Sequence, residues 1–169
     1  MRLRDVEEGD AGAYVRMRCD PVMMAELGGP LPEEKVLERL RKDVRDVAED
    51  RSWIKAIVVP DGAGEVMAGG IALWSYEEDG VAVSEVGWMV LPEFQGRGLA
   101  KAAVRELLDA AARDGRWGEV HAFPAVTNGP SNGICRALGF RLLGERDVDF
   151  ADRVLHCRHW VVKPGEHVG

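Results

Sequence analysis

Apolar and polar residues follow two different periods along the chain, and each change of period marks an element. Short apolar stretches bounded by turn residues predict strands, whereas apolar residues three or four positions apart predict amphipathic helices. The predicted strands are residues 2–5, 53–59, 66–76, 81–91, 119–124, 140–146 and 154–162. The predicted helices are residues 8–18, 32–47, 98–113 and 128–138.

This order of elements predicts an α/β fold with one mixed, mostly antiparallel sheet of about seven strands flanked by about four helices. Three consecutive strands between residues 53 and 91 are joined by short turns, which is typical of an antiparallel meander. No repeat or linker divides the chain, and 169 residues suit one core. We therefore expect a single domain over residues 1–169.

The loop at residues 95–100, Gln-Gly-Arg-Gly-Leu-Ala, joins a predicted strand to a long amphipathic helix. Two glycines and no acidic residue lie where the helix begins, which is typical of a backbone cradle for an anion. Arg97 adds a positive charge to the loop. The sequence therefore predicts a ligand that carries phosphate.

Two common phosphate loops do not fit. The ATP-type loop ends in Gly-Lys-Ser/Thr, whereas here Gly98 precedes Leu99 and Lys101 precedes Ala102. The dinucleotide fingerprint has three glycines in an early strand–helix–strand unit. This loop has two glycines, and it follows a meander in the middle of the chain.

A third kind of loop does fit. The segment EVGWMVLPEFQGRGLAKAAVRELL, residues 85–108, resembles the acetyl-CoA-binding core of the GNAT superfamily of N-acetyltransferases. Gln95, Gly98 and Ala100 occupy the positions of that family's Gln/Arg-x-x-Gly-x-Gly/Ala motif. A second segment, NGPSNGICRALGF at residues 128–140, is similar to the family's Asn-x-x-Ser…Gly-Phe block. The last strand, with His159-Trp160, is similar to the branch that contains ribosomal-protein N-terminal acetyltransferases.

The resemblance implies a GNAT fold in which the fourth and fifth strands splay apart to admit acetyl-CoA. It implies that backbone N–H groups of residues 96–100 hold the pyrophosphate, and that an N–H near Val90 binds the thioester carbonyl. The implied acetyl-CoA-binding residues are Met89, Val90, Leu91, Gln95, Gly96, Arg97, Gly98, Leu99, Ala100 and Asn128. The alternatives are a plain strand-to-helix turn for the glycines, a core position for Val90 and a helix N-cap for Asn128.

Acetylation of an amine requires the neutral form of the amine, so a general base is useful. Glu85 is the first candidate, because it lies on the central strand before the loop, where many members of the family have a carboxylate. Its alternative is a solvated or salt-bridged strand residue. His121, on the neighbouring strand, is the second candidate, with a reference pKa near neutrality.

Two residues are candidates for protonating the leaving thiolate. Ser131 matches the serine of the second block, and its alternative is an ordinary residue of the first helical turn. Cys135 stands where many members of the family have a tyrosine, four residues before Gly139-Phe140. A free cysteine is more often a small buried apolar residue, so the acid step stays open.

The acceptor is expected to lie between two loops. Residues 20–30 contain two methionines, which suit an adaptable apolar lining. Residues 147–152, read as a loop between the closing strands, carry Asp147, Asp149 and Asp152 around Phe150 and are expected to hold a cation. The predicted acceptor is therefore a small cationic amine or a peptide N-terminus.

Composition argues against several classes of binding partner. A net charge of −7 argues against nucleic acid. The three widely spaced cysteines predict free thiols, and no signal-like or membrane-spanning apolar run is apparent, so a cytoplasmic protein away from membranes is expected. The run His156-Cys157-Arg158-His159 is not expected to bind metal, because neighbours on a strand face opposite ways. By analogy with the family's edge strands, a homodimer is one expectation.

The leading interpretation is direct transfer of an acetyl group from acetyl-CoA to a primary amine in a ternary complex. One alternative is a non-catalytic acyl-CoA-binding or sensory domain, which would keep the loop but lack a working base. Another is a different nucleotide-binding α/β domain, which would bind ATP or NAD and not CoA.

Overall fold

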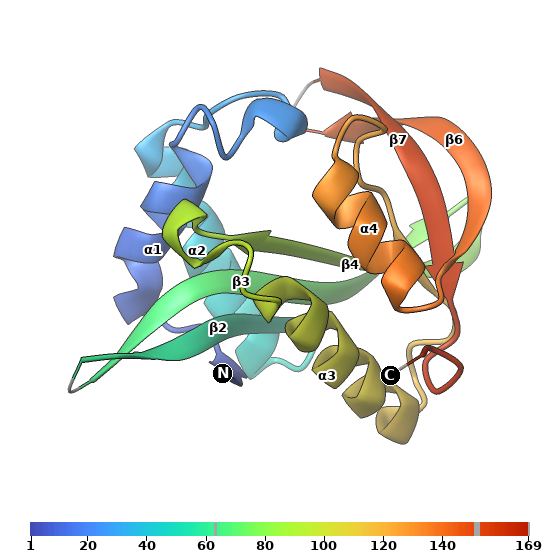
Figure 1. Cartoon of the computed structure of the whole chain (residues 1–169), viewed down its shortest axis with the longest axis horizontal. Coiled ribbons are helices and arrows are strands. Elements are labelled where there is room, and N and C mark those ends of the chain that lie inside the picture. Colours follow the sequence, from blue (N-terminus) through green and yellow to red (C-terminus); the bar gives the residue numbers. More distant parts are fainter. Residues whose placement is uncertain (63, 151–152, 169) are drawn as a thin grey trace.

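The computed structural model of the chain describes residues 1–62, 64–150 and 153–168. Seven strands form one sheet in the order β1-β2-β3-β4-β5-β7-β6 (Figure 1). The strands are β1 Arg2–Asp5, β2 Trp53–Asp61, β3 Gly64–Glu78, β4 Val81–Val90, β5 Val120–Ala122, β6 Arg141–Phe150 and β7 Arg153–Val162. The α-helices are α1 Ala11–Arg18, α2 Glu33–Ala48, α3 Leu99–Asp114 and α4 Gly129–Ala137, with short 3₁₀ segments η1 Glu8–Asp10, η2 Ala25–Leu27 and η3 Pro92–Phe94.

The sheet is antiparallel except between its central strands, β4 and β5, which run parallel. Their pairing is limited to Ser84 with Val120 and Glu85 with His121, although β4 continues to Val90. Beyond Glu85 the two strands diverge. The mixed sheet of seven strands and the splay between the fourth and fifth strands are therefore confirmed.

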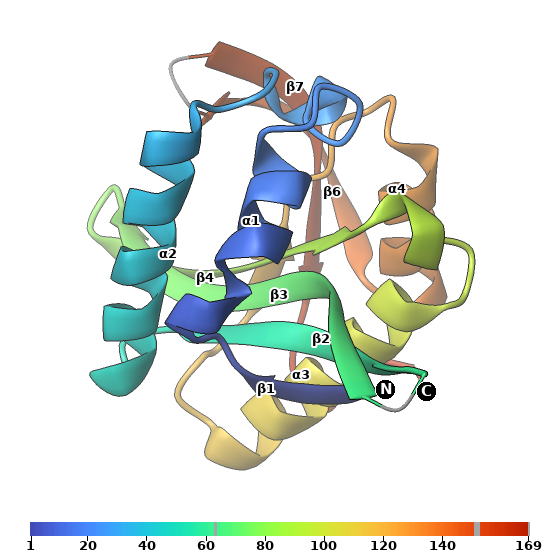
Figure 2. The same cartoon turned by 90° about the vertical axis from the view of Figure 1, so that its left-hand side faces the viewer.

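Helices cover both faces of the sheet (Figure 2). One core joins α3 and α4 to apolar side chains of the central strands, and it contains Leu107, Leu138, Val86 and Trp160. A second core joins α1 and α2 to the other face through Tyr14, Val36, Leu40, Ala56 and Val58. No helix of the described residues is long and apolar enough to cross a membrane.

Two strands extend further than the sequence pattern predicts. β3 runs to Glu78 instead of ending at Tyr76, because Asp79 and Gly80 form a tight turn with φ of 51° and 78°. β6 runs to Phe150 instead of ending at Arg146, because it stays paired with β7 up to Phe150 and Arg153. The predicted loop at 147–152 was therefore wrong for residues 147–150, and Asp152 lies outside the described residues.

The buried side of α2 is less apolar than its pattern indicates. Val36 and Leu40, two apolar residues one helical turn apart, are buried, but so are Asp43 and Asp46. Asp43 accepts hydrogen bonds from the Tyr14 hydroxyl at 3.0 Å and from Arg39 Nε at 2.7 Å. A pattern based on hydrophobicity does not predict the burial of carboxylates that are paired in this way.

Candidate active site

The turn between β4 and α3 has the geometry of an anion cradle. Gly96 and Gly98 adopt φ of 72° and 73°, which favours glycine. Gly98 caps α3 without a side-chain hydrogen bond, and the helix's first turn holds no acidic residue. The helical bond from Ala102 N–H to Gly98 carbonyl oxygen leaves the N–H groups of residues 99–101 free of helical partners. These donors and the positive end of the helix fit a diphosphate.

The side chains around the cradle hold its shape. Gln95 Nε2 donates to the carbonyl oxygen of Val90 at 2.8 Å, which ties the loop to the end of β4. Arg97 is exposed, and its guanidinium carbon lies 5.6 Å from the centre of the Phe94 ring. The assignment of Gln95, Arg97, Leu99 and Ala100 to ligand binding stays a prediction, and their positions around one helix start agree with it.

The open edge of β4 offers backbone donors to the splay. Leu91 N–H donates to Ala68 carbonyl oxygen on β3 at 2.8 Å. Because neighbouring residues of a strand direct their N–H groups to opposite edges, Met89 and Leu91 face β3, whereas Val90 and Trp88 face the splay. Of Met89, Val90 and Leu91, the three β4-end residues predicted to bind acetyl-CoA, Val90 thus presents its N–H group where a ligand would enter.

Asn128 and Ser131 lie at the start of α4. Asn128 Oδ1 accepts a hydrogen bond from Ser131 N–H at 3.1 Å, so its alternative as an N-cap is confirmed, while its contact with a ligand stays a prediction. The Ser131 side chain is half-buried in the first turn.

Asn132, which no sequence motif singled out, is fully buried. Its Nδ2 donates to the carbonyl oxygens of Ala125 at 2.9 Å and Asn128 at 2.8 Å, and its Oδ1 accepts from Trp160 Nε1 at 2.9 Å. A polar residue at an apolar position of the helix was the available signal.

Glu85 occupies the point where β4 and β5 part. It pairs with Trp74 on β3 and with His121 on β5, so these three side chains share one face of the sheet, which we call the Glu85 face. Burial raises the pKa of Glu85 to about 7, although the Tyr76 hydroxyl and Arg146 act in the opposite direction. A carboxyl group with this pKa can accept a proton at neutral pH and release it again.

The second base candidate, His121, lies in a small aromatic cluster. Its Nδ1 is 2.7 Å from His159 Nε2, and the Phe123 ring lies 4.6 Å from that of His159 between ring centres. Burial lowers the pKa of both histidines, and the nearby Arg146 acts in the same direction. Both imidazoles are therefore neutral near pH 7, as a proton acceptor must be.

Cys135 is fully buried in the core between α4 and the sheet. Burial raises the pKa of its thiol to about 12. Its proposed role as an acid stays a prediction, but this burial agrees with the alternative of a small apolar residue.

The acidic residues of β6 do not face Glu85. Asp147 pairs with His156, whose Nδ1 is 2.8 Å from Asp147 Oδ1, and Asp149 shares that side of the strand. Arg146 and Phe150 alternate with them and lie on the Glu85 face. The expected cation site of aspartates around Phe150 was therefore wrong for the described residues. Within residues 1–62, 64–150 and 153–168, no group of three or more potential ligands is placed to hold a metal ion.

Comparison with known proteins decides the family. Residues 1–141 match the sequence model described as "Acetyltransferase (GNAT) domain". The chain belongs to the GNAT acetyltransferase family. A 67-residue stretch, 40% of the chain, is 33% identical to an acetyltransferase of Pseudomonas aeruginosa, and the match spans only 34% of that relative's length.

Solved GNAT structures share the fold over nearly the whole chain. A GNAT acetyltransferase of Bacillus anthracis has a TM-score of 0.77 at 18% identity, covering 97% of this chain and 95% of that one. Spermidine N-acetyltransferase of Vibrio cholerae, in complex with CoA and spermine, has a TM-score of 0.77 at 20% identity, covering 98% and 96%. Ribosomal-protein-S5-alanine acetyltransferase of Vibrio fischeri has a TM-score of 0.75 at 17% identity, covering 99% and 94%.

The cradle can be tested by charge. Lys101→Glu places a carboxylate in the first turn of α3, where it suits the helix but repels a bound diphosphate. We expect the Kd for acetyl-CoA to rise about tenfold, measured by calorimetry, with unchanged thermal stability. Arg113→Glu makes the same charge change about 18 Å away on the same helix and should leave the Kd nearly unchanged. Equal effects of both variants would contradict the cradle.

Proposed function

We propose that the protein transfers an acetyl group from acetyl-CoA to a primary amine by direct attack. The observation that carries this proposal is the position of Glu85, which has a pKa near 7 and lies on the same strand that ends at the anion cradle. A base, an open strand edge and a diphosphate site thus follow one another along a single segment of chain. The GNAT relatives named above support the donor, since one of them is complexed with CoA.

The donor is held by backbone along its length. The N–H groups at the start of α3 bind the pyrophosphate, and Val90 binds the pantetheine arm at the open edge of β4. The N–H of Trp88, the next one along this edge, receives the thioester carbonyl and stabilises the oxyanion during attack. Trp88 is three residues from Glu85, or about 10 Å along the strand.

The chemical step needs one proton acceptor and one proton donor. Glu85 removes a proton from the bound ammonium group through a water molecule, and the freed amine attacks the carbonyl carbon. The new C–N bond forms as the C–S bond breaks. The nitrogen then gives up its second proton, which reaches the leaving thiolate through the Ser131 hydroxyl or solvent, so the net proton released is the one that Glu85 accepted. His121 lies beside Glu85 as the second acceptor. The described side chains provide no covalent intermediate in this scheme.

The proposal is tested by following thiol release from acetyl-CoA across a panel of primary amines at pH 8. We expect turnover with at least one amine and mass-spectrometric detection of its N-acetyl product. Binding of acetyl-CoA without turnover on any amine would favour the non-catalytic sensory domain instead. Binding of ATP or NAD in place of acetyl-CoA would favour the other nucleotide-binding class.

A further inference from the structure

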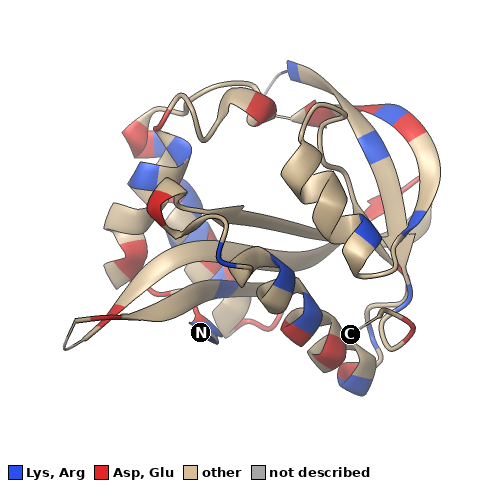
Figure 3. Ribbon diagram, in the orientation of Figure 1, with Lys and Arg blue, Asp and Glu red and all other residues tan. Residues whose placement is uncertain are grey.

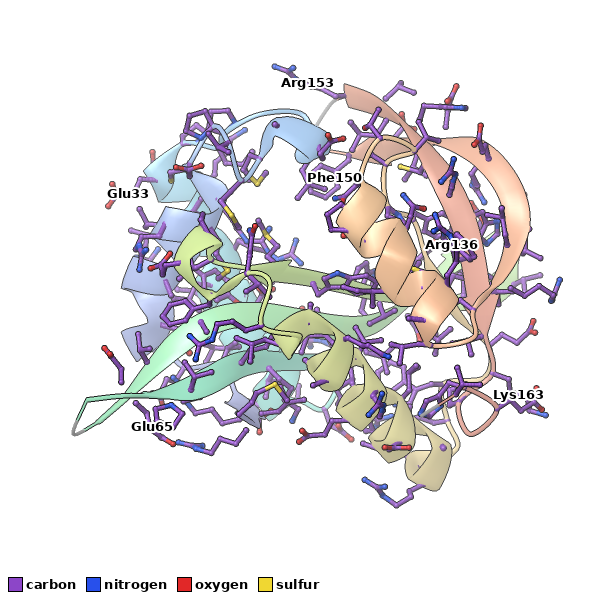
Figure 4. The ribbon with its side chains drawn as sticks, viewed as in Figure 1. Glu33, Glu65, Arg136, Phe150, Arg153 and Lys163 are labelled. Atoms are coloured by element: carbon purple, nitrogen blue, oxygen red, sulfur yellow. The ribbon has the colours of Figure 1, made fainter. Side chains whose placement is uncertain are left out.

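Aromatic rings dominate the Glu85 face. Trp74 and Tyr76 alternate along β3, Phe123 follows β5, and Phe150 ends β6. Phe123 belongs to this face because its ring is stacked 6.3 Å from that of His121. Figure 4 shows Phe150 between the η2 segment and α4 in that view. Rings from β3, from the end of β5 and from the end of β6 therefore lie on the face of the sheet that carries Glu85.

The Trp74 ring lies against β4. A Cβ atom built on Gly87 would lie 3.4 Å from Trp74 Cη2, so the indole extends from β3 across β4 at Gly87. Gly87 leaves room for the ring on the strand that carries Glu85. A half-buried indole beside a carboxylate offers an apolar surface for a carbon skeleton and a ring face for an ammonium group.

The charges of this face suit one ammonium group and not several. Glu78 is bound to Arg146 at 2.6 Å, and Asp147 lies on the opposite face. In the described part of the sheet, Glu85 is therefore the carboxylate on the Glu85 face to which no arginine or lysine is bound. Figure 3 shows charged residues on the outer helices and on the β6–β7 hairpin, while the part of β4 that is visible in this view carries none. Within the described sheet, a polyamine would find no second carboxylate on this face that is free of an arginine or lysine.

The loop at residues 20–31 covers this face from above (Figures 1 and 2). Thr127 Oγ1 donates to Glu26 Oε2 at 2.5 Å, which joins the loop to the segment before α4. Arg153 of β7 packs on Gly28, where a built Cβ would lie 3.0 Å from Arg153 Cδ. Met24 between these contacts is fully buried. A long chain leading away from Glu85 would have to displace these contacts, whereas a small molecule would not.

We infer that the acceptor is a small primary monoamine with an apolar, preferably aromatic, carbon skeleton, and that Trp74 is the residue that binds the skeleton. This inference rests on the proposed acetyl transfer and names its substrate class. It departs from the polyamine named for the Vibrio cholerae spermidine enzyme, because in the described sheet Asp147 is turned away from the Glu85 face and Glu78 is bound by Arg146.

The test compares 2-phenylethylamine, ethylamine, spermidine and an unmodified tripeptide in the thiol-release assay. We expect kcat/KM for 2-phenylethylamine to exceed that for spermidine and for the tripeptide by at least roughly tenfold. Trp74→Ala should lower kcat/KM for 2-phenylethylamine by about tenfold, mainly through KM, and should change that for ethylamine much less. Trp74→Phe should recover most of the loss. Glu77→Ala, on the exposed opposite side of β3, is the matched control, with unchanged values expected.

Each outcome decides a separate point. If spermidine or the tripeptide is the better acceptor, the monoamine class is wrong while acetyl transfer stands. If Trp74→Ala reduces the rates with 2-phenylethylamine and ethylamine equally, Trp74 does not bind the skeleton. If acetyl-CoA binds and no amine is acetylated, the proposed function fails, and this inference fails with it.

Discussion

Glu85→Gln is expected to lower kcat/KM for the amine by about 100- to 1,000-fold at pH 8, while the Kd for acetyl-CoA stays unchanged. The glutamine keeps the size of the side chain and its polar contact with Tyr76 but cannot accept the proton. Because the pKa of Glu85 is about 7, the wild-type kcat/KM should fall as the pH drops below 7, and this inflection should be absent from the variant. The amine's own titration lies higher and affects both proteins alike.

Stability measurements on Glu85→Gln provide an independent check of the raised pKa of Glu85. The pKa of Glu85 is raised from 4.5 to about 7 in the folded protein, so the folded state holds this proton more tightly than the unfolded chain. The carboxylate therefore destabilises the fold increasingly as the pH rises from 4.5 through 7. Glu85→Gln should raise the free energy of unfolding at pH 8 by on the order of 2 kcal/mol, with little change at about pH 3.5, where the carboxyl group is protonated in both states.

His121, the other candidate for the general base, provides the result that would contradict the assignment of Glu85. His121→Asn should reduce kcat/KM by less than Glu85→Gln. A Glu85→Gln enzyme with wild-type turnover at pH 8 would exclude Glu85 as the base, and a larger loss in His121→Asn would transfer that role to His121.

Asn132→Ala is expected to lower the free energy of unfolding by about 3 kcal/mol, because it leaves a buried indole N–H and two carbonyl oxygens with lost partners. In a protein of this size the melting temperature should fall by roughly 10 °C. Denaturant unfolding of Asn132→Ala and Trp160→Phe, singly and together, measures how strongly the pair is coupled.

Asn128→Ala is the matched control for this prediction. It removes one N-cap hydrogen bond at the half-buried start of the same helix, so its expected cost is about 1 kcal/mol. A loss below 1 kcal/mol in Asn132→Ala, measured in the same way, would show that these three hydrogen bonds contribute little.

The fold was predictable from sequence, and so were the positions of the residues proposed to bind the donor, because local patterns encode them. The glycine loop, Pro92 after the strand and the start of α3 are neighbours in the chain, and their proposed roles rest on backbone geometry alone. The splay between β4 and β5 was predictable only through the family resemblance. Strand ends were less accurate, since the turn at Asp79-Gly80 and the pairing of β6 with β7 extend the strands through acidic residues.

The acceptor half was less predictable because it is assembled from distant strands. The face on which Asp147 lies depends on the register of β6 with β7, and a bulge between Leu142 and Gly144 shifts that register. The alternation of Trp74, Tyr76 and Glu78 along β3 indicated that these side chains share one face of the strand. Only the pairing of Trp74 with Glu85 shows that this face is the one that carries the proposed base. Asn132 was hidden for a related reason, since its partner Trp160 lies 28 positions away.

In the scheme proposed above, the placement of Trp74 on β3 separates the choice of acceptor from the binding of the donor. None of the parts assigned to acetyl-CoA, which are the end of β4, the cradle and the start of α4, contains this residue. Substitution at position 74 can therefore alter which amine is acetylated without rebuilding the machinery that delivers the acetyl group. A protein with this division can acquire a new substrate by drift at one strand position, and directed evolution of this enzyme should begin there.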